Sequence, residues 1–247
     1  MKYEKIDKEL YIHNRSRFIK GLKPNSLAIF NSNDIVTTGA DSTTPFVQHR
    51  DILHLSGVDQ EESILVIFPD CFEQKNREIL FLKETSDLIA VWEGAKLDKE
   101  QAFETSGIQT VYWLDQFDSV FNALMSEAEN VYINTNEHIR ANTEAENRED
   151  RFIKMCQEKY AAHNYERSAP IMHEIRSIKH PIEIELMQKA CEITEKGVRR
   201  LLDFIKPGVM EYNIEAELMH EFLNNRSQGF AYTPIIASGY SACVLHY

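Results

Sequence analysis

Short apolar segments alternate with helical patterns along the first part of the chain. The apolar runs have the length of buried strands and occupy residues 26–31, 64–68, 79–82, 110–113 and 131–133. Apolar positions three and four apart, the spacing of a helix with one buried face, occur in residues 11–19, 98–105 and 114–128. Strands that alternate with helices predict an α/β layer.

Two polar stretches interrupt this pattern. Residues 32–45 are polar and contain Gly39 and Pro45, which predicts a long loop. Residues 134–151 are dense in charge and are either a loop or the start of an exposed helix. Residues 152–165 show a helical pattern that Ala169-Pro170 breaks, so we expect a domain boundary near residue 170, with domains at 1–170 and 171–247.

The second region begins with the strongest helical pattern in the chain. His180-Pro181 places proline at the first helical position, and Pro207-Gly208 ends the helix. A second helix follows, with Ile214, Leu218 and Phe222 four residues apart. Residues 233–239 and 242–247 are two short apolar runs that predict a hairpin. Because a final strand would need partners that these residues do not supply, we expect the chain to be the leading part of a longer protein.

Charge and cysteine content narrow the classes of function. The 247 residues include 27 Lys and Arg against 39 Asp and Glu, a net charge of −12. This acidic balance disfavours nucleic acid or an anionic membrane as a partner, and no apolar run approaches the length of a membrane span. The four cysteines are far apart, without a CxxC motif, which favours reduced, mostly buried thiols in a cytoplasmic protein.

Histidine and carboxylate groups are the next candidates for chemistry. In an extended strand, His49 and Asp51 would share one face and His54 the other, so the three would not converge. We therefore interpret them as surface or hydrogen-bonded core residues. The segment 217–221 places two glutamates and a histidine on one helix face, which suits either a metal or, as we prefer, a solvated acidic face.

His246 lies in the last apolar run. Alternation places Ala242, Val244 and His246 on one face of the predicted strand. The pattern alone leaves two interpretations open, a hydrogen-bonded core histidine and a catalytic one.

Several segments resemble a known family. Residues 173–198, 206–218 and 232–247, which ends in VLHY, resemble the start of the catalytic domain of aminopeptidase P, a relative of prolidase and creatinase with the pita-bread fold. Residues 41–68 and 91–97 resemble the N-terminal domain of the same family. The resemblance implies a creatinase-like α/β domain with a mixed sheet, followed by the first part of an α+β pita-bread catalytic domain.

The resemblance also implies an activity. Family enzymes remove the N-terminal residue from peptides with proline in second position, using a pair of Mn²⁺ ions that hold a bridging water. The family's five metal ligands follow the LHY segment, so none is expected in this chain, and the chain alone is expected to be inactive. The expected partners are a proline-containing peptide and further copies of the protein, as a dimer or tetramer. The alternatives are prolidase, which cleaves dipeptides, and a non-catalytic pita-bread module that binds peptides.

Three residues match functional positions of the family. His246 matches an active-site histidine expected to hydrogen-bond the substrate or the developing oxyanion. Asp41 and Trp92 match positions that reach a neighbouring subunit's active site, where they would contact the substrate's amine and side chain. The alternatives are a loop-capping role for Asp41 and a packing role for Trp92. The chain departs from the family at Val47 and Arg50, which replace an arginine and a small polar residue.

Overall fold

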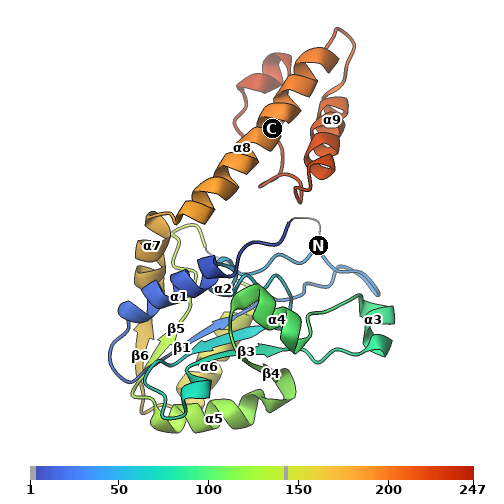
Figure 1. Cartoon of the computed structure of the whole chain (residues 1–247). Coiled ribbons are helices and arrows are strands. Elements are labelled where there is room, and N and C mark those ends of the chain that lie inside the picture. Colours follow the sequence, from blue (N-terminus) through green and yellow to red (C-terminus); the bar gives the residue numbers. More distant parts are fainter. Residues whose placement is uncertain (1–3, 142–143) are drawn as a thin grey trace. The chain divides into compact units, whose positions relative to one another are not determined.

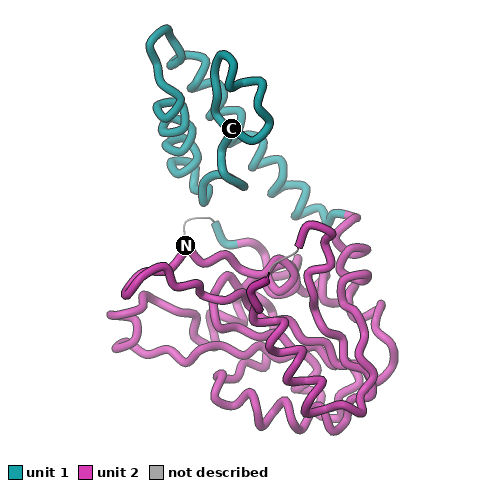
Figure 2. Tube along the Cα trace, turned by 180° about the vertical axis from the view of Figure 1, so that it is seen from behind, with its two compact units in different colours: residues 1–5, 179–247 teal, residues 6–178 magenta. Residues whose placement is uncertain are grey.

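The computed structural model describes residues 4–141 and 144–247. The chain divides into two compact units, which we describe separately (Figure 2). Residues 6–178 form the larger unit, and Lys179–Tyr247 make up most of the smaller one. These compact units do not test the domain limits expected from the sequence, 1–170 and 171–247, which remain a prediction.

The larger unit is built on a mixed six-stranded sheet in the order β4-β3-β2-β1-β5-β6. Its strands are β1 (Ser26–Asn31), β2 (Ile64–Ile67), β3 (Glu78–Leu82), β4 (Thr110–Trp113), β5 (Asn130–Ile133) and β6 (Asn164–Arg167). β2 runs antiparallel to both β1 and β3, whereas the pairs β1–β5, β5–β6 and β3–β4 are parallel. The mixed α/β sheet expected from the sequence is therefore confirmed.

Helices cover both faces of this sheet (Figure 1). They are α1 (Glu9–Lys20), α2 (Arg50–Ser56), α4 (Lys99–Ser106), α5 (Phe117–Glu127), α6 (Arg148–Lys159) and α7 (Ala169–Ser177), whereas α3 (Asp87–Glu93) projects to one side (Figure 1) and contains no buried residue. One core cluster joins residues of α1, α2, α4 and α7 to one face of the sheet, and a second joins α5 and α6 to the other. Neighbouring strand residues alternate between the clusters, as Leu27 and Ala28 do. Burial on both faces explains why the strands read as continuous apolar runs.

The helix predicted over 152–165 is wrong at its C-terminal end. α6 ends at Lys159, and β6 follows and pairs with β5. The Tyr165 hydroxyl donates to the carbonyl oxygens of Cys156 (2.6 Å) and Tyr160 (3.0 Å), which satisfies acceptors at the end of α6. Pro170 lies in the first turn of α7, where a missing N–H is tolerated, so it starts a helix and does not break one.

The smaller unit contains the two predicted helices, α8 (Pro181–Phe204) and α9 (Glu211–Asn224). Pro181 begins α8, and His180 caps it by accepting the N–H of Ile182 at Nδ1. The two helices meet at Gly197, where an added Cβ would lie 3.1 Å from a methyl group of Leu218. None of the described helices is both long and apolar enough to cross a bilayer.

The predicted hairpin over residues 233–247 does not form. The described residues of this segment contain no strand, and the short 3₁₀ helix η3 (Gly239–Cys243) spans the turn between the two apolar runs and the start of the second run. Glu211 instead holds the segment by accepting from the Ser238 N–H (2.7 Å) and the Tyr247 hydroxyl (3.0 Å). A two-stranded hairpin without further strands to pack on is marginally stable, which explains the failure of the alternation pattern.

Candidate functional site

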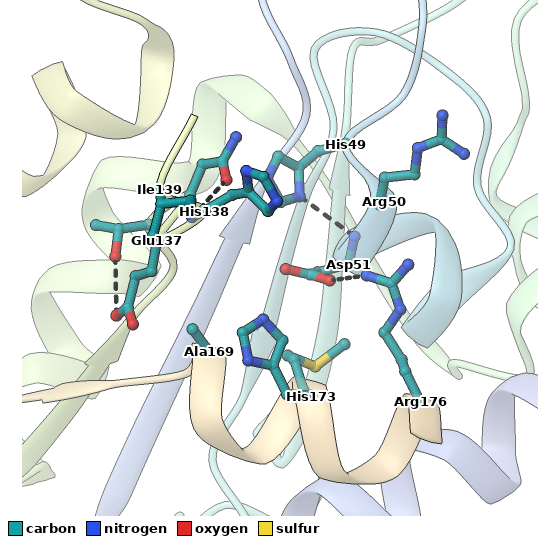
Figure 3. Close-up of a pocket in the computed structure, with 12 residues that line it drawn as sticks. His49, Arg50, Asp51, Glu137, His138, Ile139, Ala169, His173 and Arg176 are labelled. Atoms are coloured by element: carbon teal, nitrogen blue, oxygen red, sulfur yellow. Dashed lines mark hydrogen bonds and ion pairs between the residues drawn. The ribbon is translucent and has the colours of Figure 1, made fainter. Parts of the chain in front are cut away.

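A pocket of the larger unit lies at the carboxyl ends of parallel strands β5 and β6, beside α2 (Figure 3). This is the edge at which open α/β sheets bind ligands. The cavity has a volume of about 420 Å³. It is lined by His49, Arg50, Asp51, Thr135, Asn136, Glu137, His138, Ile139, Ala169, Met172, His173 and Arg176.

His49 is fixed by its neighbours at the start of α2. Its Nδ1 accepts the backbone N–H of Asp51 (3.3 Å), and the Asn134 amide lies 3.4 Å from the same nitrogen. Burial lowers the pKa of His49, Arg176 lowers it further, and Asp51 partly opposes both. The ring is therefore held neutral near pH 7.

Two ion pairs set the shape of the pocket. Arg176 of α7 donates to Asp51 of α2 (2.8 Å), which ties the two helices together across the cavity. Arg167, at the end of β6, forms a two-pronged pair with Glu137 and so fixes the loop that follows β5. This pair lowers the pKa of Glu137, chiefly through the hydrogen bond from Arg167.

A smaller cavity of about 110 Å³ adjoins the first and shares His49, Thr135 and Asn136 with it. Its lining includes Glu149, whose carboxyl group accepts from the Asn31 backbone N–H (3.0 Å) and side-chain amide (2.9 Å). Burial raises the pKa of Glu149 to about 7, although both hydrogen bonds oppose the shift.

Sequence reasoning missed this pocket because it placed His49, Asp51 and His54 in an extended strand. The structure instead forms α2, so His49 is a helix cap, and His54 is not among the lining residues. A signal was present: Ile52 and Leu55 are three residues apart, and Gly57 ends the helix in the left-handed conformation. Nothing in the sequence indicated that segments near residues 50, 137 and 173 would meet.

Asp41 and Trp92 lie elsewhere in the larger unit. Asp41 is exposed in a turn closed by the bridge between Thr37 and Thr43. Trp92 is 83% exposed on α3. The loop over 37–43 and α3 project from the same end of the unit (Figures 1 and 2).

His246 belongs to the smaller unit. It is exposed in a turn after η3 and not on a strand. The structure therefore does not gather the three predicted site residues within one unit, and their roles remain predictions.

The acidic segment of α9 is engaged in ion pairs. Arg200 of α8 contacts Glu217 (2.5 Å) and Glu221 (3.7 Å). Across the described residues, no three His, Cys, Asp or Glu side chains are grouped so that they could hold a metal ion. The described residues thus do not fit a metal centre by themselves. Contrary to expectation, only two of the four free cysteines are buried, because Cys191 and Cys243 are exposed.

Comparisons with known proteins agree with this architecture. The aminopeptidase P N-terminal domain model matches residues 11–132, and the metallopeptidase family M24 model matches residues 185–247. The Xaa-Pro aminopeptidases of Haemophilus influenzae and Escherichia coli are 28% and 26% identical to this chain over 98% of its length. The matched regions cover 54% and 55% of those two proteins. The chain thus spans about half the length of the curated relatives it matches.

Solved structures give the same result. A Bacillus anthracis structure assigned as an aminopeptidase P superposes with a TM-score of 0.88 at 26% identity, covering 98% of this chain and 57% of that one. Aminopeptidase P from E. coli, in its low-pH form, has a TM-score of 0.85 at 25% identity, with coverage of 99% and 56%. These features define a class of protein, an α/β N-terminal domain followed by part of a metallopeptidase domain. The chain belongs to the aminopeptidase P family of the pita-bread superfamily.

Proposed function

We propose that the protein containing this chain is an Xaa-Pro aminopeptidase, which hydrolyses the bond between an N-terminal residue and a following proline. The observation that carries the proposal is the order of the two family matches along the chain. Two relatives that match 98% of its length, from Haemophilus influenzae and Escherichia coli, are Xaa-Pro aminopeptidases. An Xaa-Pro bond is a tertiary amide without an N–H. Recognition must therefore use the shape of the proline, the carbonyl oxygen and the free amino terminus.

The three family-matched residues suit these tasks. His246 would donate to the substrate or to the oxyanion that develops on the scissile carbonyl. Asp41 would pair with the substrate's ammonium group, and Trp92 would pack against its side chain. Their exposure supports the assignment, because each side chain is accessible to a second molecule. If Asp41 and Trp92 act in a neighbouring copy's site, the protein is a homo-oligomer.

The family match also bears on cofactor and compartment. Because the described residues do not fit a metal centre, we assign the proposed pair of Mn²⁺ ions to residues outside this chain. Two divalent ions there would supply Lewis-acid chemistry. The four free thiols suit a reducing compartment, and we propose the cytoplasm.

The test is hydrolysis by the complete natural protein that contains this chain. With added Mn²⁺ we expect cleavage of Ala-Pro-Ala but not of Ala-Ala-Ala, and loss of activity with a chelator. Cleavage of the dipeptide Ala-Pro alone would identify a prolidase. Binding of Ala-Pro-Ala without hydrolysis under any divalent metal would identify a non-catalytic module.

A further inference from the structure

Asp41 lies in a short turn that is closed by side chains as well as by the backbone. Thr37 and Thr43 form an isolated antiparallel bridge, and the Thr38 N–H donates to the carbonyl oxygen of Ser42 (2.9 Å). Beside this bond, the hydroxyls of Thr38 and Ser42 lie 3.0 Å apart and are hydrogen-bonded to each other. Because an isolated hairpin is marginally stable in water, the bond between the hydroxyls adds materially to what holds this exposed turn.

Gly39 leaves room for the bond between the two hydroxyls. It follows Thr38 in the turn, and a Cβ added to it would lie 2.9 Å from Oγ of Ser42. An alanine at this position would therefore push the Ser42 hydroxyl away from Thr38. The missing side chain of Gly39 and the pair of hydroxyls thus form one arrangement.

The Asp41 carboxylate is not used to hold the turn. Within residues 4–141 and 144–247, its oxygens take part in no hydrogen bond or ion pair. An aspartate that caps a loop accepts a nearby backbone N–H with its side chain. In this turn Thr38 and Ser42 make the closing bonds, which leaves the carboxylate available to a second molecule.

We propose that Ser42 is a positioning residue for Asp41, a proposal that rests on the proposed function, in which Asp41 pairs with the substrate's ammonium group. The hydrogen bond to Thr38 limits the conformations of the turn, so the carboxylate is already held in place when the peptide arrives. Ordering a flexible group on binding costs affinity, and a turn ordered in advance avoids that cost. Ser42 therefore strengthens binding of the free amino terminus without touching the substrate.

The test uses the complete natural protein with added Mn²⁺. Ser42→Ala should raise the KM for Ala-Pro-Ala about fivefold, within the range of one hydrogen bond between neutral groups, and should change kcat by less than about twofold. Propanoyl-Pro-Ala has nearly the same shape but no ammonium group, so its inhibition constant as a competitor should not change. A general loss of structure would instead weaken both peptides alike.

Further variants separate the hydrogen bond from the residue that makes it. Ser42→Thr keeps the hydroxyl and should keep the original KM, whereas Gly39→Ala should displace the hydroxyl and raise the KM as Ser42→Ala does. Thr43→Val is the matched control, because Thr43 is exposed in the same turn and its hydroxyl is not part of the bond between Thr38 and Ser42.

Asp41→Asn distinguishes failure of the positioning role from failure of the proposed function. It should raise the KM for Ala-Pro-Ala more than Ser42→Ala does, and adding Ser42→Ala to it should have no further effect, because Ser42 acts through Asp41. If Asp41→Asn raises the KM but Ser42→Ala does not, or if the two effects add, the positioning role is wrong and the proposed function stands. An unchanged KM in Asp41→Asn would contradict the assignment of Asp41 and the positioning role together.

Discussion

Single residues of this chain show how burial changes a group's chemistry. Glu149 and Glu158 lie on the same helix, α6, yet Glu149 is 8% exposed and Glu158 is exposed. Arg15 is 1% exposed, and its guanidinium donates to the carbonyl oxygens of Leu55 (2.8 Å) and Ser106 (2.9 Å) at the ends of α2 and α4. These side chains lie where the ends of elements need polar partners.

Glu149 should make the stability of the larger unit depend on pH. Its pKa rises from 4.5 to about 7 on folding, so the folded state binds more protons between these values. Its contribution to the free energy of unfolding is complete below about pH 4.5 and is lost as the pH rises through 7. The loss amounts to roughly 3 kcal/mol, at 1.36 kcal/mol per pKa unit. Chemical denaturation from pH 5 to 8 should show a smaller fall in unfolding free energy for Glu149→Gln than for the unaltered chain. Glu158→Gln should keep the original slope, and equal slopes in all three proteins would contradict the assignment.

The prediction for catalysis at the residue scale concerns His246. If it contacts the reacting carbonyl, His246→Ala in the complete protein should lower kcat by about 10²-fold or more, in the range of a lost oxyanion donor, with little loss of bound metal. Steady-state kinetics with Ala-Pro-Ala and metal analysis measure the two effects. His220→Ala, also exposed in the smaller unit, is the control. Parallel loss of metal and activity in His246→Ala would indicate a structural role.

At the scale of elements, the sequence predicted what depends on local pattern and missed what depends on tertiary contacts. The runs over 26–31 and 79–82 are strands because both their faces are buried, and Pro181 starts α8 as its position required. β6 was missed because its residues, NYER, have no apolar run and gain their order by pairing with β5. The pocket was missed for the same reason, because His49, His138 and His173 are far apart in the sequence and line one cavity only in the folded chain.

A substitution at Gly57 tests the backbone conformation with which α2 ends. It has a φ of 70°, and an added Cβ would lie 2.3 Å from the ring of Tyr11, which is 6% exposed. Gly57→Ala should therefore cost more than the roughly 1–2 kcal/mol of left-handed strain alone. Gly107 is the matched control, because its φ is 74° and its Cβ would lie 2.6 Å from the side chain of Ile12, which is 36% exposed and so freer to move than the ring of Tyr11. Thermal or urea denaturation compares the two, and an equal cost would show that the Tyr11 contact is not limiting.

At the scale of the whole molecule, the two units differ in how much apolar surface they bury. The larger unit holds two core clusters, whereas Gly197 is the one buried residue among those described in α8 and α9. Leu202 (74%), Ile205 (53%) and Met187 (53%) are large apolar side chains of the smaller unit left exposed. Exposed apolar side chains in such number are typical of a surface that packs against further protein.

The last prediction concerns this exposed surface. The 247-residue chain should bind a hydrophobic dye such as ANS at neutral pH, and Leu202→Glu should reduce the fluorescence with little change in melting temperature, since Leu202 is not in a core. Leu88→Glu on α3 is the matched control, because Leu88 is 73% exposed but belongs to the larger unit. Equal reduction by both variants would mean that the dye does not distinguish the units. A chain that binds no dye would show that the surface is covered in solution, for example by a second copy, which sedimentation would then detect.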